Sequence, residues 1–274
     1  MSRPGPDTAI GRHFDFRLPS NRIAIGGSVA AFGALAVASL FNDDLTIIGA
    51  GFAAVGVFIA WAVSRELDPG MPSAATWTMV LALAFAFWSL PGALVSGVTL
   101  IGIRLIVGSV GVRLTLVDAL SFALIGGAAM IDPIGWMAAA MIAIWLWTAP
   151  EVGKRRRIGQ ASFAVGVVGG IAVGLLATWG DSPFDAEVTA TAYVLAAIAG
   201  GAMLFAARPV QVTAETDGGS GTIDAVRVRF GRLAAGSACM WAAVIAGVDG
   251  FWQLGPVFAA LVVAAAYRVF VHAA

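Results

Sequence analysis

The residue most able to do chemistry is Arg104, because it stands within an apolar stretch, 93–111, that is long enough to be buried in a membrane. A charged side chain in such a place is costly, so it marks a functional site unless it reaches water. Arg104 lies roughly 10 Å along a helix from the nearer end of the stretch, and its guanidinium could extend to the lipid headgroups there. Alternatively, it faces other helices and binds an anionic substrate or pairs with Asp118, near the end of the following stretch. This second interpretation makes Arg104 and Asp118 the candidate substrate-binding residues.

Two carboxylates, Glu66 and Asp68, lie close together in the connection 65–73 and raise the prospect of metal or phosphate chemistry. Pro69 and Gly70 in the same connection are typical of a turn, and Ser73 is suited to cap the helix that follows. We therefore expect a turn here rather than a binding site.

Four consecutive basic residues form the densest positive cluster of the sequence: Lys154, Arg155, Arg156 and Arg157. Such a cluster can bind anionic lipid headgroups. It can also simply anchor the orientation of a membrane protein, because Lys and Arg remain on the cytoplasmic side. Both interpretations place the lipid bilayer beside these residues as a partner.

Motifs for catalysis or metal binding are missing from the sequence. It contains no H-E-x-x-H, no G-x-S-x-G and no P-loop, and His13 and His272 lie outside the apolar stretches. The single cysteine, Cys239, excludes a disulfide within the chain. A net charge of zero argues against a nucleic-acid partner, because binding to phosphates needs an excess of Lys and Arg. We expect no enzyme activity, no cofactor and no metal.

The elements that position these residues are predicted to be transmembrane helices. Hydrophobic residues make up 59% of the chain and charged residues 12%, an excess that one soluble core cannot hide. A membrane-spanning helix needs about 20 apolar residues. Stretches of this kind predict an all-α multi-pass membrane protein with about ten transmembrane helices: 23–41, 45–64, 74–90, 93–111, 115–131, 134–150, 159–179, 188–207, 232–248 and 252–271.

The basic residues predict the orientation of this bundle. If the N-terminus is cytoplasmic, every Lys and Arg except Arg104 falls on the cytoplasmic side. The outer connections then carry only acidic charges: Asp43, Asp44, Asp132, Asp181, Asp185, Glu187 and Asp249. Because Lys and Arg in short loops stay in the cytoplasm, we expect both termini there, in a protein of the plasma membrane.

Outside the apolar stretches, the segment 210–230 is predicted to form a small cytoplasmic β-hairpin. Apolar and polar residues alternate in 210–213 and again in 226–230, and the glycines between them indicate a turn. Residues 14–18 alternate in the same way and could add a third strand, which an isolated hairpin needs for stability. The alternative is an irregular loop beside an N-terminal arm.

This organisation divides the chain into four parts. A cytoplasmic arm, 1–22, precedes eight transmembrane helices in 23–207. The loop or hairpin 208–231 follows, and 232–274 holds two further transmembrane helices and a short cytoplasmic tail.

Three classes of function fit these features. A transporter or permease for an apolar or amphiphilic substrate, in one form a lipid-linked anion, suits the short loops and the single deep cation. The scarcity of carboxylates inside the stretches argues against its coupling to protons or sodium. A non-catalytic membrane subunit or scaffold would instead use the apolar, glycine-rich helices and bind a protein partner at the cytoplasmic face. A lipid-modifying membrane enzyme is the third class.

Overall fold

The computed structural model describes residues 15–42, 45–111, 189–209, 211–217 and 221–270, together with isolated positions between 118 and 138. The described part is helical, with seven helices and no strand in those ranges. The helices are α1 (Pro19–Ala38), α2 (Ile47–Leu67), α3 (Pro72–Ala86), α4 (Ala93–Val107), α8 (Ala190–Ala206), α9 (Ala225–Gln253) and α10 (Gly255–Phe270).

Each predicted transmembrane stretch that falls on the continuous described ranges overlaps one of these helices. The predictions for 115–131, 134–150 and 159–179 lie outside those ranges. α3 ends at Ala86 and α4 begins at Ala93, so the segment 87–92, which contains Pro91 and Gly92, separates these two helices. The apolar pattern therefore predicts where helices form in this chain.

Local capping explains where several helices begin and end. The Thr46 hydroxyl accepts a hydrogen bond from the Gly49 amide at the start of α2, with a distance of 3.0 Å. Pro72 opens α3, where its missing N–H costs nothing. Gly108 ends α4 in the left-handed conformation, at φ 69°, which glycine adopts without strain. Asp224 caps α9 by accepting a hydrogen bond from the Val226 amide at 2.8 Å.

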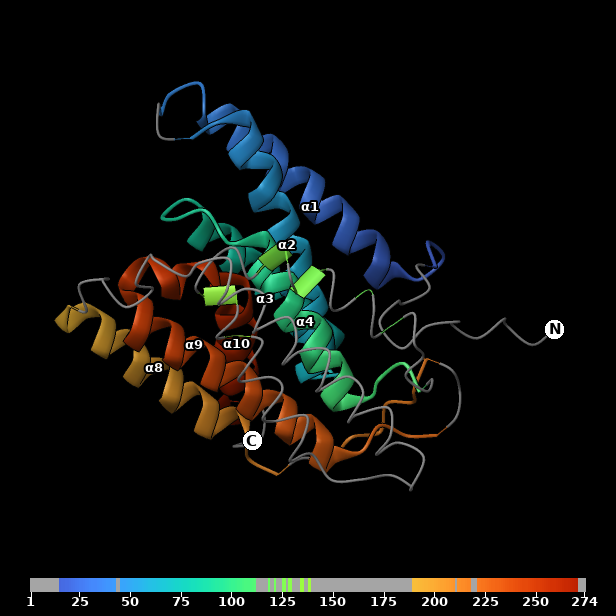
Figure 1. Ribbon diagram of the computed structural model, residues 1–274. Coiled ribbons are helices and arrows are strands. Elements are labelled where there is room, and N and C mark those ends of the chain that lie inside the picture. The colour runs from blue at the N-terminus through green and yellow to red at the C-terminus, as the bar shows by residue number, and fades with distance from the viewer. Residues whose placement is uncertain are drawn as a thin grey trace.

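The helices form one bundle in which α2 and α10 lie side by side (Figure 1). α10 also packs on α3, α8 and α9, and α9 packs closely along α8 and α4. α1 contacts α2 and α3 and lies along the outer edge of the bundle. The largest apolar core contains Trp61, Phe251 and Leu254, which come from α2, from α9 and from the turn after α9.

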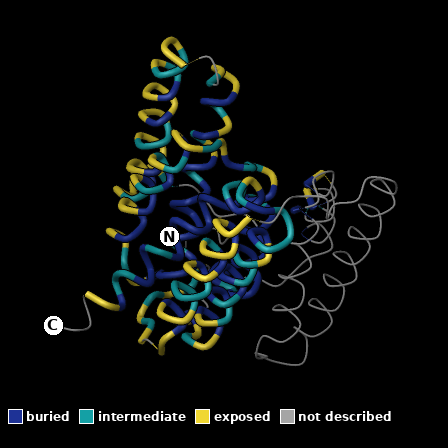
Figure 2. The backbone as a smooth tube through the Cα atoms, turned by 90° about the vertical axis from the view of Figure 1, so that its left-hand side faces the viewer, coloured by how far each residue is buried: buried dark blue, intermediate teal, exposed yellow. Residues whose placement is uncertain are grey.

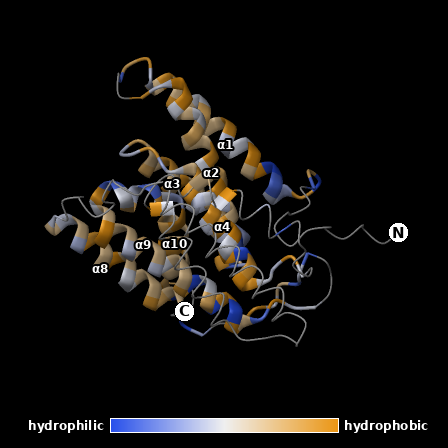
Figure 3. Cartoon of the chain, in the orientation of Figure 1, coloured by the Kyte–Doolittle hydropathy of each residue, from blue (hydrophilic) through white to orange (hydrophobic). Residues whose placement is uncertain are grey.

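Much of the outer surface is apolar. Three helices, α1, α2 and α9, are long and apolar enough to cross a membrane, and the other four described helices are shorter but also apolar. Large apolar side chains stand exposed on several helices, including Val29 at 64%, Ile48 at 74% and Leu204 at 67%. Exposed positions run along the outer helices in Figure 2, and much of the described helical surface is coloured as hydrophobic in Figure 3. An apolar surface of this extent is stable in contact with lipid and costly in water, which indicates association with a membrane.

α9 is interrupted near its end by Gly247, whose φ of 68° and ψ of −156° are accessible to glycine but not to other residues. After this kink α9 continues to Gln253, and Leu254 turns the chain directly into α10. The Gln253 carbonyl accepts hydrogen bonds from the Gly92 amide at 3.1 Å and from the Ser96 hydroxyl at 2.8 Å. These bonds tie the end of α9 to the start of α4.

The prediction of a β-hairpin over 210–230 is largely wrong. A short antiparallel bridge joins Glu215 and Thr222, flanked by the hydrogen bond from the Ile223 amide to the Ala214 carbonyl at 2.9 Å. The expected second strand, 226–230, instead lies in the first two turns of α9, because Asp224 caps a helix at this point. The expected third strand fails too, since residues 15–18 form a turn that leads into α1 at Pro19.

Candidate functional site

Two carboxylates at the end of α2 form buried ion pairs with arginines from other helices. Glu66 Oε1 lies 2.9 Å from Arg104 Nε, and the Glu66 side chain is completely buried. The sequence assigned Glu66 to a turn, but α2 continues to Leu67 and carries Glu66 into its last turn, facing α4. The deep cation Arg104, only 9% exposed, is therefore paired with a carboxylate that the sequence analysis assigned to a turn and did not consider as its partner.

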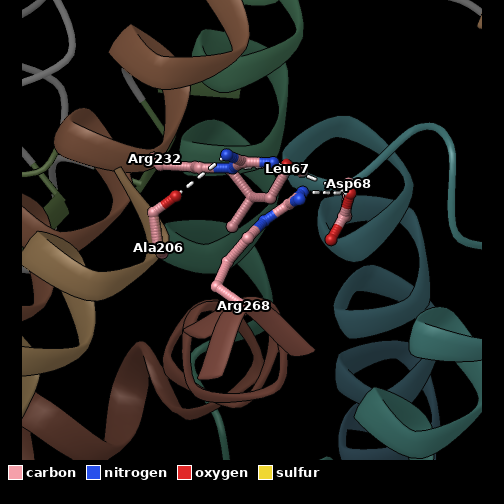
Figure 4. A network of polar contacts seen from close by, with 5 residues as sticks. All are labelled: Leu67, Asp68, Ala206, Arg232 and Arg268. Carbon is pink, nitrogen blue, oxygen red and sulfur yellow. Dashed lines mark hydrogen bonds and ion pairs between the residues drawn. The ribbon is translucent and has the colours of Figure 1, made fainter. Parts of the chain in front are cut away.

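Two arginines reach the carboxylate of Asp68, the residue that follows α2 (Figure 4). Its Oδ1 is 2.7 Å from Nη2 of Arg268 on α10 and 3.6 Å from Nη2 of Arg232 on α9. All three residues are buried, with exposed fractions of 1 to 6%. One carboxylate oxygen thus links the end of α2 to two helices that follow much later in the chain.

Arg232 and Arg227, both near the start of α9, donate hydrogen bonds to the carboxyl ends of three other helices. Arg232 Nε donates to the Leu67 carbonyl of α2 at 2.7 Å, and its Nη1 donates to the Ala206 carbonyl of α8 at 2.9 Å (Figure 4). Arg227 Nη2 donates to the Leu105 carbonyl of α4 at 2.8 Å. Helix carboxyl ends carry partial negative charge and unsatisfied carbonyls. These contacts explain how guanidinium groups are tolerated inside an apolar bundle.

We call this end of the bundle, where Glu66, Asp68, Arg104, Arg227, Arg232 and Arg268 lie, the charged end. It brings together the carboxyl ends of α2, α4, α8 and α10 with the amino end of α9. Taken from the sequence alone, the scarcity of carboxylates in the apolar stretches argues against coupling to protons or sodium. The structure corrects the premise of that argument, because Glu66 and Asp68 are both buried at this end of the bundle.

A pocket of about 610 Å³ opens beside the charged end. Asp68, Arg268 and Arg208 supply its charged lining, while Met71, Phe205 and Val269 are among its apolar lining residues. The Arg208 guanidinium carbon lies 4.5 Å from the centre of the Phe205 ring, within the range of a cation–π contact. The pocket therefore combines positive charge with apolar surface.

Farther along α4, Ser96 and Thr99 are completely buried and their hydroxyl groups bind backbone carbonyls. The Ser96 hydroxyl donates to Gln253, and the Thr99 hydroxyl donates to the Val95 carbonyl at 2.8 Å. The Ser96 hydroxyl thus joins α4 to the end of α9, whereas the Thr99 hydroxyl bonds within α4, and both lie in a closely packed part of the bundle.

The other predicted site residues have different outcomes. Asp118 is buried, at 1% exposure, and its pairing with Arg104 stays a prediction. The basic cluster Lys154 to Arg157 lies outside the described residues. Within the described ranges, no group of three His, Cys, Asp or Glu side chains could hold a metal ion.

Sequence reasoning missed Asp68, Arg232 and Arg268 as parts of one site. One signal could have found Glu66, because it continues the buried face of α2 that Ile59 and Val63 form at helical spacing. No local signal joins Asp68 to Arg268, which are 200 residues apart in the chain. Comparisons with protein-family models, with curated proteins and with solved structures found no match to this chain.

Proposed function

We propose that this chain is a multi-pass protein of the plasma membrane with ten transmembrane helices and both termini in the cytoplasm. In this proposal the protein is a transporter or permease-like protein that moves an amphiphilic anionic substrate, for example a lipid-linked anion. Its charged end faces the cytoplasm. The alternation of helix ends supports this topology, since α2, α4, α8 and α10 end where α9 begins.

The observation that carries the proposal is the charged end itself. Ion pairs and arginine-to-carbonyl bonds there join five helices. Away from the charged end, the described contacts among these helices include a large apolar core, together with the hydrogen bonds from Gly92 and Ser96 to the Gln253 carbonyl. A permease must close and reopen one side of its bundle, and discrete polar contacts between helix ends provide two alternative arrangements for such a change. The cationic pocket beside them is suited to an anionic group.

Transport is tested with the full-length protein in proteoliposomes that contain a trace of fluorescent NBD-phosphatidylglycerol. Dithionite added outside quenches only the outer leaflet, so transfer between leaflets appears as additional quenching. We expect faster transfer of this anionic probe than of the neutral-headgroup probe NBD-phosphatidylcholine. Inserted protein that leaves both probes at the rate of protein-free vesicles would contradict the proposal.

A non-transporting membrane subunit is the second candidate, and two observations favour it. The helices around Ser96 and Thr99 are closely packed, and an apolar hollow of about 340 Å³ lies on the outer side of α1 and α2, lined by Val29, Phe32 and Val55 among others. Both features suit a scaffold that holds a partner helix. This candidate predicts that the protein, extracted from its host in a mild detergent, migrates as a stoichiometric complex with a second protein.

A further inference from the structure

We propose that the pocket beside the charged end binds the phosphate headgroup of an amphiphile, with Arg208 and Arg268 as its anion-binding residues and Asp68 as a built-in competitor. This inference extends the proposed function by giving the substrate a binding place and a headgroup class. The inference concerns the binding of the headgroup, and this binding can be measured in detergent, where no transport takes place.

The charges of the pocket favour an anion. Among its described lining residues, two arginines face one aspartate, so the lining carries a net positive charge. Asp68 also lies near Arg232, which means that the one carboxylate in the lining serves two guanidinium groups. A phosphate group brings the negative charge and the hydrogen-bond acceptors that arginines bind most strongly.

The shape and lining of the pocket favour an amphiphile over a small free anion. A volume of about 610 Å³ is in the range of small-molecule sites and far exceeds the size of a phosphate ion. Met71, Phe205, Val212 and Val269 provide apolar surface next to the arginines. A cation–π contact places the Arg208 guanidinium beside the Phe205 ring, and Arg208 is an exposed residue, so a ligand in the pocket can reach its N–H groups.

When the pocket holds no anion, the Asp68 carboxylate forms an ion pair with Arg268. A ligand oxygen that binds Nη2 of Arg268 competes with Asp68 Oδ1, which is 2.7 Å away. The displaced carboxylate remains beside Arg232, which cannot follow the ligand because its Nε and Nη1 bind the Leu67 and Ala206 carbonyls. Ligand binding would thus exchange the contact between α2 and α10 for contacts with the headgroup.

Binding is tested with the purified full-length protein in dodecylmaltoside, by calorimetric titration with dioctanoyl phosphatidic acid. Dioctanoylglycerol tests the tail alone and inorganic phosphate tests the headgroup alone. We expect the phosphatidic acid to bind at least tenfold more tightly than either. Inorganic phosphate that binds as tightly as the lipid would show a site for free anions and overturn the inference.

Variants locate the site and test the competitor. Arg208→Gln is expected to weaken binding at least tenfold, whereas Arg229→Gln removes the same charge from an exposed position of α9 outside the pocket lining and is expected to have little effect. Asp68→Asn removes the competitor and is expected to tighten binding about fivefold. Equal losses in the two arginine variants, or weaker binding by a folded Asp68→Asn protein, would overturn the inference. If the lipid binds as expected but is not moved in proteoliposomes, the site stands and the transport proposal fails.

Discussion

At the scale of single residues, the charged end accepts buried arginines because carboxylates and helix carbonyls lie within reach of them. Arg232 shows this most clearly, since it is 1% exposed and reaches a carboxylate and the carbonyls of two helices. A lysine could not do this, because its single ammonium group cannot reach the fixed fork of positions that a guanidinium reaches. The position therefore requires arginine for geometry as well as for charge.

Glu66 and Arg104 offer a direct test of buried pairing. Removing one partner leaves the other charge buried, so Glu66→Met or Arg104→Met alone should each lower the free energy of unfolding by roughly 3–5 kcal/mol. Replacing both with Met fills a similar volume without charge and should restore most of that loss. Thermal unfolding of the purified protein in detergent measures all three variants.

The double variant decides whether these residues form a unit. A double variant that is as unstable as the sum of the single losses would show that Glu66 and Arg104 act independently.

The single variants also test whether Arg104 takes part in transport, when the transport rate of each variant is compared with its stability. If Arg104→Met folds stably and moves the lipid probe like the wild type, Arg104 has no role in the proposed activity.

At the scale of elements, close helix packing depends on glycine at defined positions. Gly236 on α9 faces Met203 on α8, and a Cβ atom built on Gly236 would overlap the Met203 side chain. Small residues at such contacts let helix backbones approach each other closely. This explains why α8 and α9 pack along most of their length.

The substitution Gly236→Ala is expected to destabilise the protein by about 1–3 kcal/mol, because it overfills a packed contact. Gly201→Ala is the matched control on α8, since a Cβ there meets no atom within 4 Å. Alanine favours helix over glycine by about 1 kcal/mol, so this variant should keep or raise stability. Melting temperatures of the two variants in one detergent compare them, and equal losses would show that the α8–α9 contact is not tight.

The loop before α9 shows how an element can be misjudged from its sequence. The alternation in 226–230 is real, yet Arg227 and Val228 are both buried in the helix that Asp224 caps. A helix that packs against several other helices can bury two adjacent residues, one against each neighbour. Alternation of apolar and polar residues over only five positions therefore does not distinguish a strand from a helix. The hydrogen bond from Arg227 to Leu105 of α4 is a tertiary contact that favours the helix.

At the scale of the whole molecule, the orientation in the membrane is the property most open to a direct test. Arg229 and Asp249 are exposed positions near opposite ends of α9, roughly 30 Å apart along the helix. In intact cells, Asp249→Cys should react with an impermeant maleimide, whereas Arg229→Cys should react only after permeabilisation. Native Cys239 is completely buried and should not interfere.

The reverse labelling pattern would place the charged end outside and contradict the proposed topology. Reaction of both positions in intact cells would mean that α9 does not span the membrane. In either case the transport proposal would lose the cytoplasmic placement of its pocket, while the bundle itself would remain.

The sequence alone determined that this chain is helical and apolar and where most of its described helices lie. These are local properties, since the length of an apolar stretch and the proline, glycine and capping residues at its ends act within a few residues of one another. The stretches 45–64 and 93–111 were located in this way, and α2 and α4 overlap them. Even the exposed apolar surface follows from a composition that no soluble core could bury.

Only the tertiary structure decided what the charged residues do. Arg104 was visible as a deep cation, but its partner Glu66 depended on α2 running three residues past its predicted end at 64. Arg232 meets Leu67 across 165 residues of chain, and Arg268 meets Asp68 across 200. Ion pairs between distant residues arise from how whole helices pack, and helix packing is set by many weak contacts that no short stretch of sequence encodes.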